Sequence, residues 1–379
     1  MSKKILIFGL GVLGSNVLDM LLQSANNYEI TVVGRSEDKI HERINLADLV
    51  ASNLGFYKNV SYEIVDVNDI SKTADIIYKE NPDIIFNATT KMSYWVPTKL
   101  PKEVFGKLYY AFTGWQVPMH LTLTYKLMQA VKASGRTVRV INASYPDVIN
   151  VALDKIGLAP EVGIGNLANV VPVIKKAISL HENIPIEKLD IRAYGHHHFS
   201  YMLPSLGSAE NLPYHLEVYY EKLNITKYLN FQSIFNLLPT KLKRTRGLEG
   251  MIMTAASAVN IINSMAVGNK EEIMHAPGPN GLPGGYPIII NEDCTEVVLP
   301  NDLNLQEVIE INLLGQVMDG IQKIDSDGNI YYSNNEMEIV KEIFGYECLV
   351  MNVNDCELWS EELHSKFSEY YKKTMLQHS

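Results

Sequence analysis

The stretch Lys4-Ile-Leu-Ile-Phe-Gly9-Leu-Gly11-Val12-Leu13-Gly14 lies near the start of the 379-residue sequence and decides the fold. Its continuous apolar run is typical of a strand in a parallel sheet that is covered on both faces. In Gly-x-Gly-x-x-Gly the first glycine permits a tight turn, the second lets the backbone approach a pyrophosphate, and the third lets helix and strand pack closely. The pattern predicts a strand, a turn and a helix whose N-terminus binds a dinucleotide.

Outward from this stretch, apolar strands alternate with amphipathic helices, which predicts βαβ units around a parallel sheet. We expect strands at 4–8, 29–33, 61–65, 83–87 and 137–142, and helices at about 15–24, 40–54, 71–80 and 120–134. Residues 89–119 lack clean periodicity and contain three prolines, so we expect a functional loop or a lid there. The fold class is therefore α/β, with a doubly wound parallel Rossmann domain over residues 1–148.

The remainder of the chain, residues 149–379, reads as a mixed α/β substrate domain with a C-terminal extension. We expect helices at 172–180 and 250–267, strands at 188–193, 287–291 and 295–298, a hairpin turn at 325–329 and a polar helix ending near 373. Asn260 and Asn263 interrupt the apolar stretch at 251–267, so it predicts a core helix and not a membrane span.

Composition narrows the class of partner. Hydrophobic residues make up 46% of the chain, charged residues 20%, and the net charge is −10. Nucleic acids and anionic membranes are held by basic patches, so we expect neither and favour a small-molecule substrate. The three cysteines show no metal-ligand spacing. We therefore expect no disulfide framework, no metal site and a reducing, cytoplasmic location.

Gly34-Arg35-Ser36 ends the second predicted strand, where an NAD-binding chain would place an acidic residue against the ribose 2′-hydroxyl. A guanidinium binds phosphate through two hydrogen bonds or stacks on adenine, and a serine hydroxyl adds a donor. Arg35 and Ser36 therefore favour NADP over NAD. The alternative for Arg35 is a solvated surface arginine.

Polar residues also follow the next three strands. Ligands of such sheets lie outside the carboxyl ends of the strands, so these positions are candidates for cofactor contact. Ordinary strand-end capping is the alternative. The candidates are Asp66 and Val67 toward the adenine, and Asn87, Ala88, Thr89 and Asn142 toward the nicotinamide.

The order of several motifs resembles the lactate/malate dehydrogenase-like superfamily, from residue 4 to about 325. The segment 37–49 resembles the family helix that begins with lysine and leads to an Asp-Leu pair. Four later segments are similar to the family motifs Val-x-Asn-Pro-Val-Asp-Val, Gly-x-Gly-x-x-Leu-Asp, Gly-Glu-His-Gly and Gly-Val-Pro-x-x-Leu. They are, in that order, 141–148, 163–169, 194–198 and 285–290. The resemblance implies a homodimer or homotetramer.

The resemblance makes His197 the catalytic acid/base, with Asn169 and Ser144 as its neighbours. A side chain that titrates near neutrality suits this role. Asn169 stands where the family has the aspartate that orients the histidine. An amide can fix the tautomer but offers no charge to favour imidazolium, so we expect a weaker base unless another carboxylate acts on His197.

Two family arginines have no counterpart. Pro172 stands at the position of the arginine that binds the substrate carboxylate, and no arginine occurs between Arg43 and Arg136. The expected substrate is therefore not lactate, malate or a close analogue. Other cations are candidates for an anionic substrate, although a charged run is more often a solvated face. They are Lys91, Arg192, Arg244 and Arg246.

His196, His197 and His198 leave three readings open: acid/base or substrate contact, a structural role, or metal binding. On a strand, consecutive histidines would point to opposite faces, so at most two would share a metal. The sequence as a whole predicts an NADPH-dependent oxidoreductase that transfers hydride to a carbonyl or imine carbon. The alternatives are a dinucleotide-binding sensor or assembly partner without turnover, and an opine- or imine-type reductase.

Overall fold

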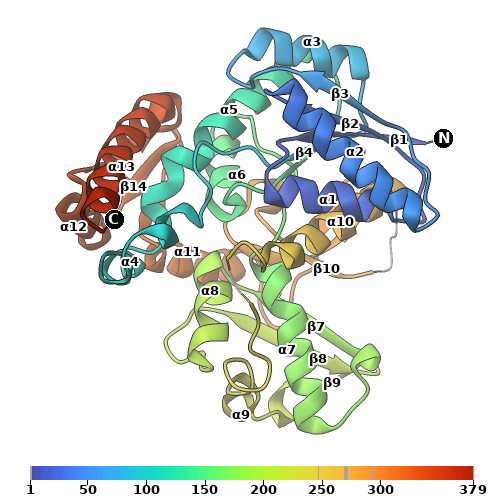
Figure 1. Ribbon diagram of the computed structural model, residues 1–379. Coiled ribbons are helices and arrows are strands. Elements are labelled where there is room, and N and C mark those ends of the chain that lie inside the picture. Colours follow the sequence, from blue (N-terminus) through green and yellow to red (C-terminus); the bar gives the residue numbers. More distant parts are fainter. Residues whose placement is uncertain (1, 246, 269–271, 292, 379) are drawn as a thin grey trace.

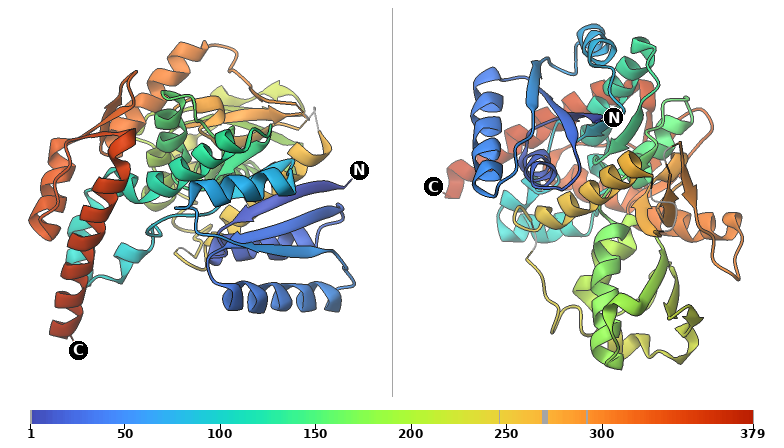
Figure 2. Two further views of the ribbon diagram at one scale, coloured as in Figure 1. Left: turned by 90° about the horizontal axis from the view of Figure 1, so that it is seen from above. Right: turned by 90° about the vertical axis from the view of Figure 1, so that its right-hand side faces the viewer.

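The protein is described here by a computed structural model that covers residues 2–245, 247–268, 272–291 and 293–378 (Figures 1 and 2). The helices are α1 (Val12–Leu22), α2 (Glu37–Asn53), α3 (Ile70–Glu80), α4 (Lys102–Tyr109), α5 (Val117–Ser134), α6 (Pro146–Asp154), α7 (Leu167–Glu182), α8 (His197–Leu206), α9 (Phe231–Phe235), α10 (Met251–Val267), α11 (Leu305–Met318), α12 (Asn334–Phe344) and α13 (Cys356–His378).

The strands are β1 (Lys3–Phe8), β2 (Tyr28–Gly34), β3 (Val60–Ile64), β4 (Ile84–Asn87), β5 (Arg139–Asn142), β6 (Val162–Gly163), β7 (Leu189–Tyr194), β8 (His215–Tyr220), β9 (Leu223–Asn224), β10 (Met274–Pro277), β11 (Gly285–Ile290), β12 (Thr295–Val297), β13 (Ile321–Ile324), β14 (Asn329–Tyr332) and β15 (Val350–Asn352).

The parallel sheet has six strands in the order β3-β2-β1-β4-β5-β6. This order reverses direction at β1 and β4, which is the doubly wound arrangement expected from the sequence. The five strands predicted from the sequence are confirmed, within a residue or two at their ends. β6 lies past residue 148, so the sheet extends beyond the boundary drawn from the sequence.

Alternate residues of β1 serve the two faces of the sheet, as the pleat requires. Ile5 and Ile7 belong to the core under α1, α2 and α10. Leu6 and Phe8 belong to the core under α3, α5 and α6. This second core also contains residues of α12, β14 and α13, so the C-terminal segment packs on the Rossmann domain at α5 (Figure 1).

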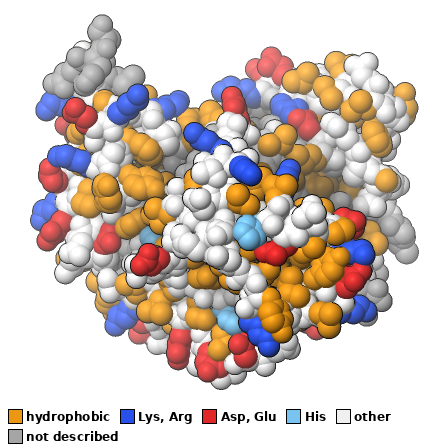
Figure 3. All heavy atoms as spheres, turned by 90° about the horizontal axis from the view of Figure 1, so that it is seen from below, with side chains coloured by type: hydrophobic (Ala, Val, Ile, Leu, Met, Phe, Trp, Pro, Cys, Tyr) orange, Lys and Arg blue, Asp and Glu red, His pale blue; other side chains and the backbone are white. Residues whose placement is uncertain are grey.

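A third core joins α7, α8 and α9 to the antiparallel sheet β7-β8-β9. This body lies below the Rossmann sheet in Figure 1. On the face seen in Figure 3, Lys and Arg side chains are interspersed with Asp and Glu. Among the described residues, no helix is both long and apolar enough for a membrane span. The three cysteines are free thiols.

Candidate functional site

The glycine-rich turn joins β1 to α1, and the protein itself gives Gly9 and Gly14 a steric reason. Gly9 has φ +93°, a left-handed value that favours glycine. A Cβ on Gly14 would lie 1.9 Å from the Gly9 carbonyl oxygen, so only glycine fits there, whereas a Cβ on Gly11 would meet nothing within 4 Å. Open space at the second glycine, at the start of α1, is what a pyrophosphate needs. Val12 begins the helix and Leu13 packs on the core below it.

The end of β2 presents Arg35 to solvent. Its side chain is 76% exposed, and its guanidinium lies 3.8 Å from the Asp66 carboxylate at the end of β3. Ser36 precedes α2, but its hydroxyl makes no capping hydrogen bond. Val67 is buried in the core. The structure thus places Arg35, Ser36 and Asp66 around one edge of the sheet, next to the glycine-rich turn, where Gly9 N–H donates to the Val33 carbonyl.

Buried amides fix the ends of β4 and β5. Asn87 donates to Thr124 Oγ1 at 3.0 Å and to Asn142 Oδ1 at 3.3 Å. Asn87 Oδ1 accepts from the Thr89 hydroxyl at 2.6 Å, and Ser144 Oγ donates to the Thr89 carbonyl at 2.7 Å. This network holds the backbone of 87–89 against the turn. A Cβ on Gly9 would lie 3.0 Å from the Ala88 carbonyl oxygen.

The histidine run lies at a strand-to-helix turn, so the argument that consecutive histidines on a strand point to opposite faces does not apply to it. β7 ends at Tyr194, His196 is the N-cap of α8, and His197 is its first residue. Gly195 breaks the strand here, where its N–H bonds the Gly285 carbonyl. In this geometry the three imidazoles do not alternate between faces, and all three turn toward one carboxylate.

That carboxylate is Asp319, the C-cap of α11, whose side chain is fully buried. His197 Nδ1 donates to Asp319 Oδ2 at 2.6 Å. His196 Nδ1 and His198 Nδ1 each lie 3.5 Å from an Asp319 oxygen, outside good hydrogen-bond geometry. A carboxylate can only accept, so the bond to His197 fixes the proton on Nδ1 and leaves Nε2 for chemistry.

The pKa values of this pair move apart. Burial alone would lower the pKa of His197, but the charge and hydrogen bond of Asp319, with the charge of Asp147, raise it above its ordinary value. Burial would raise the pKa of Asp319, yet the charge of His197 and its histidine contacts hold the pKa of Asp319 well below its ordinary value. The geometry therefore supports an imidazolium paired with a buried carboxylate. Asp319 supplies the charge that Asn169 lacks.

Tyr145, the N-cap of α6, and Asp147, in the first turn of that helix, position this pair. The Tyr145 hydroxyl donates to Asp319 Oδ2 at 2.8 Å. Asp147 Oδ1 accepts from the His197 backbone N–H at 2.9 Å, and its other oxygen accepts from the Asn166 side chain. Tyr145 has φ +42° and Asn166 has φ +49°, both in the strained left-handed half of the map. Strained non-glycine residues of this kind gather at functional sites.

Segment 89–119, expected to be a loop or lid, contains α4 and short 3-10 turns, and it packs over the histidines. The Phe112 ring lies 4.8 Å from the ring of His198, centroid to centroid. Tyr109 contacts Tyr201, which stacks on His197 at 5.7 Å. His197 retains 17% side-chain exposure. Aromatic rings thus exclude most of the solvent from the imidazole.

Two glycines allow α11 to pack closely against α8 and against the turn at residues 114–116. A Cβ on Gly315 would lie 2.5 Å from the His196 Cβ, so a larger residue would push α11 away from α8. A Cβ on Gly114, in the turn Gly114–Gln116, would lie 2.7 Å from the Asp319 carbonyl oxygen, and the Gly114 N–H donates to that oxygen at 2.9 Å. These two close contacts fix where Asp319 enters the site.

Other residues predicted for the site make their contacts away from the His197–Asp319 pair. The Asn169 amide donates to Thr254 Oγ1 at 2.8 Å, and its buried carbonyl oxygen has no hydrogen-bond partner, so the orienting contact expected of it is made by Asp319. Lys91 donates to Ser360 on α13 at 2.9 Å and lies 4.0 Å from Glu361, which ties it to the C-terminal segment. Arg246 lies outside the described residues.

Two arginine candidates occupy different places. Arg192, on β7, is 3.2 Å from Asp190 and stacks over the Tyr219 ring at 4.5 Å. Arg244 contacts the Asn169 carbonyl at 3.5 Å, beside the first turns of α7. It also lines a pocket of about 540 Å³ together with Val173 and Ser205. Arg244 is therefore the arginine that contacts Asn169, a residue that the sequence analysis predicted as a neighbour of His197.

Asp319, Asp147 and Tyr145 were not predicted as site residues. A motif signal existed for the last two, because they lie in segment 141–148, which was matched to a family motif. Asp319 had none, since an aspartate before a glycine at a helix end is common in sequences. Only the packing of α11 against α8 reveals it.

No protein-family model matches the sequence, and no curated protein matches it in sequence. Solved structures do match its fold. Lactate dehydrogenase from Eimeria maxima, solved with NADH and oxamate, is 14% identical with a TM-score of 0.54 and covers 84% of this chain and 91% of its own. Malate dehydrogenases from Aeropyrum pernix and Plasmodium falciparum are each 13% identical with TM-scores of 0.55. They cover 83% and 95% of this chain and 96% and 99% of their own. The chain thus has the lactate and malate dehydrogenase fold.

Proposed function

We propose that the protein is an NADPH-dependent oxidoreductase that reduces a carbonyl or imine carbon of a small metabolite other than a simple 2-hydroxy acid. The observation that carries this proposal is the His197–Asp319 hydrogen bond of 2.6 Å in a dehydrogenase fold. A histidine held as imidazolium by a buried carboxylate is a proton donor suited to hydride chemistry.

The residues of the Rossmann domain fit a dinucleotide. The open space at Gly11 and the N-terminus of α1 would hold the pyrophosphate. Arg35 and Ser36 would hold a 2′-phosphate, which NADP carries and NAD lacks. The backbone of 87–89 would lie along the nicotinamide, and the bound dinucleotide would supply the hydride.

His197 would move the proton. As hydride reaches the carbon, Nε2 donates a proton to the oxygen or nitrogen of the reduced group, and His197 becomes neutral. Asp319 stabilises the imidazolium before transfer and keeps Nδ1 protonated throughout, because the 2.6 Å bond fixes that tautomer. Solvent then returns the proton to Nε2. In the reverse direction, neutral His197 accepts the proton from an alcohol or amine.

The substrate differs from lactate and malate because the expected arginine clamp is absent. Pro172 lies inside α7 at the first arginine position. Arg244, next to Asn169, would contact an anionic group in its place. Replacing Arg244 by Met should raise KM for an anionic substrate more than it lowers kcat, because the contact is made in ground and transition states alike.

Titration and a substrate panel test the proposal. NADPH and NADH binding is measured by fluorescence, followed by NADPH oxidation with 2-oxo acids, with aldehydes plus amino acids, and with cyclic imines. Turnover that His197→Ala abolishes while NADPH binding persists supports the proposal. An obligatory amine co-substrate identifies an opine- or imine-type reductase. Unchanged turnover in His197→Ala would overturn the acid/base role.

Arg35→Asp tests the cofactor preference. Charge reversal should weaken NADPH binding at least tenfold, about 1.4 kcal/mol, and shift preference toward NADH. Lys72→Asp, in the first turn of α3, is the matched charge-reversal control. If Arg35→Asp bound NADPH as tightly as the unmodified protein does, the proposed preference for NADP would be refuted.

Pro172 also supports a second candidate, a dinucleotide-binding protein without turnover, because it removes a substrate contact. Tight NADPH binding with no oxidation across the whole panel would favour this second candidate. The His197–Asp319 pair would then survive as a structural ion pair only.

Self-association is part of the proposal. α2 and its C-cap carry a stripe of exposed apolar side chains, which a second copy of the chain would cover. The stripe comprises Leu46, Leu49, Val50 and Leu54. Light scattering of Leu49→Asp should report a lower mass than the unmodified protein, and an unchanged mass would exclude this surface.

A further inference from the structure

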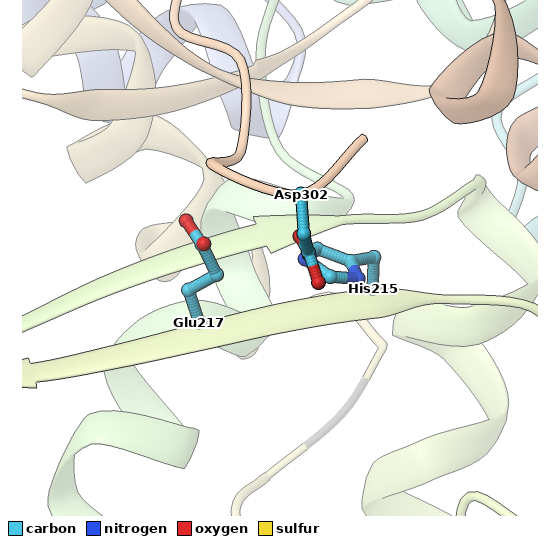
Figure 4. A group of neighbouring side chains, drawn as sticks. All are labelled: His215, Glu217 and Asp302. Carbon is cyan, nitrogen blue, oxygen red and sulfur yellow. The ribbon is translucent and has the colours of Figure 1, made fainter. Parts of the chain in front are cut away.

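A cluster of nitrogen and oxygen ligands lies on the small antiparallel sheet. His215 and Glu217 are two residues apart on β8, so both project from one face of the strand. Asp302 reaches them from the loop between β12 and α11 (Figure 4). One ligand atom from each residue lies within 4.8 Å of the others, and His215 Nε2 is 3.4 Å from Asp302 Oδ1.

Glu217 gives an independent indication of a ligand. Its residue is 4% exposed, and its Oε2 is buried without a hydrogen-bond partner. A buried carboxylate oxygen left unsatisfied is costly, which a bound cation would relieve. His215 Nε2 is likewise buried without a hydrogen bond. Two unsatisfied ligand atoms therefore belong to one cluster.

The neighbouring cation does not neutralise this carboxylate. Arg192 faces Glu217 across the β7–β8 pair, but its guanidinium pairs with Asp190 and stacks on Tyr219. Among the described residues, no ion pair within 4.0 Å joins Arg192 to Glu217. Burial, followed by the charge of Glu217 and a hydrogen bond to that carboxylate, raises the pKa of Tyr219, so the polar group it places beside Glu217 is a neutral hydroxyl.

Two hydrogen bonds from Asn301 already hold the loop over the strand. The Asn301 N–H donates to Glu217 Oε1 at 3.1 Å, and the Asn301 side chain donates to the Tyr219 hydroxyl at 2.6 Å. Asp302 follows directly, with its side chain 70% exposed. Metal–ligand bonds of about 2.0–2.2 Å place two ligand atoms of one ion at most about 4.4 Å apart. The three ligand atoms, which lie within 4.8 Å of one another, must therefore move closer together when an ion binds. Asp302 has the freedom to rotate inward.

We propose that His215, Glu217 and Asp302 bind a divalent transition-metal ion, with Zn²⁺ as its best-matched representative. One imidazole and two carboxylates form a donor set that suits Zn²⁺ and leaves a fourth position for water. The ion would tie β8 to the loop before α11, the helix that carries Asp319 at its other end. His-x-Glu on a strand is a weak sequence signal, and the third ligand comes from a distant segment, so these three residues do not stand out as metal ligands in the sequence.

Metal binding by the full chain without an affinity tag tests this site. After treatment with a chelator, the protein is titrated with Zn²⁺ by calorimetry and with Co²⁺ by visible absorption, and bound metal is counted by elemental analysis. One equivalent of Zn²⁺ and Co²⁺ bands typical of four or five ligands are expected. Zn²⁺ should also raise the thermal unfolding temperature. Absence of binding would overturn the proposal.

Three variants locate the ion. Asp302→Asn, at an exposed loop position, and Glu217→Gln should each weaken Zn²⁺ binding at least tenfold and remove the Co²⁺ bands. His181→Gln is the matched control, because His181 also lies beside a carboxylate, 2.7 Å from Glu182, but without a buried third ligand. Full affinity in Asp302→Asn and Glu217→Gln, or loss of binding in His181→Gln alone, would refute the assignment.

Discussion

His197 and Asp319 share a 2.6 Å hydrogen bond although 122 positions separate them in the chain. One comes from the start of α8 and the other from the end of α11. Asp319, which is distant in the sequence, orients the histidine in place of Asn169, which the sequence predicted for that role. The protonation of His197 therefore depends on how two helices pack.

Replacing Asp319 by Asn should lower the pKa of His197. Burial, the largest single influence on this imidazole, lowers its pKa, and the variant removes the Asp319 charge, which outweighs burial only together with the Asp319 hydrogen bond and the Asp147 charge. A pH titration of the histidine ring signals, followed by NMR, measures the pKa shift without a substrate. The signal that disappears in His197→Gln identifies His197. Asp327→Asn, in the exposed hairpin turn, is the control. An unmoved His197 titration in Asp319→Asn would contradict the proposed coupling.

The same pair should make stability depend on pH. His197 has a raised pKa, so its contribution is complete below its ordinary value of 6.5 and disappears as pH rises through the raised value. Asp319 has a depressed pKa, so its contribution is complete above 3.8 and disappears as pH falls through the depressed value.

Asp319→Asn should therefore cost the most stability, on the order of 3 kcal/mol, between about pH 4 and pH 6.5. Urea unfolding of both proteins across this range and up to pH 9 measures the difference. A difference that grows toward pH 9 would be inconsistent with a raised histidine pKa.

Gly315→Ala should separate α11 from the histidines. The added Cβ would lie 2.5 Å from the His196 Cβ, which cannot rotate away. We expect a loss of about 1–3 kcal/mol in unfolding free energy and a weaker His197–Asp319 contact. Gly106→Ala in α4 is the matched control, because its Cβ meets nothing within 4 Å and should be neutral or stabilising. Equal stability of the two variants would disprove the steric argument.

Gly11→Ala and Gly14→Ala should fail in different ways. At Gly14 the new Cβ would lie 1.9 Å from the Gly9 carbonyl oxygen, so folding itself should suffer. At Gly11 it meets nothing within 4 Å, so the protein should stay stable while dinucleotide binding weakens at least tenfold. Thermal unfolding and fluorescence titration separate the two effects. Undiminished NADPH binding in Gly11→Ala would place the pyrophosphate elsewhere.

The sequence predicted the Rossmann domain because its signals are local. A continuous apolar run such as 4–8 can be recognised as a strand without information on distant residues. The same holds for glycines whose positions are required by a local turn. His197 was likewise selected from a local motif. Its surroundings were not, since α8, which begins directly after the turn at Gly195, was not predicted from the sequence.

Asp319 could not be predicted, for a physical reason. Its importance comes from helix packing made possible by Gly315 and Gly114, and no spacing within its own segment reports that contact. Lys91 shows the reverse case. A cation after β4 had the right position in the sequence, yet the C-terminal helix α13 supplies its hydrogen-bond partner.

The shared core of β1 and the C-terminal segment has a consequence for biosynthesis. Leu6 and Phe8 leave the ribosome long before Val353 and Phe367, which belong to the same core. The nascent Rossmann sheet must therefore keep an apolar face uncovered until the C-terminal segment has been made, which leaves that face open to aggregation. A fragment ending after β6 would inherit that uncovered face permanently.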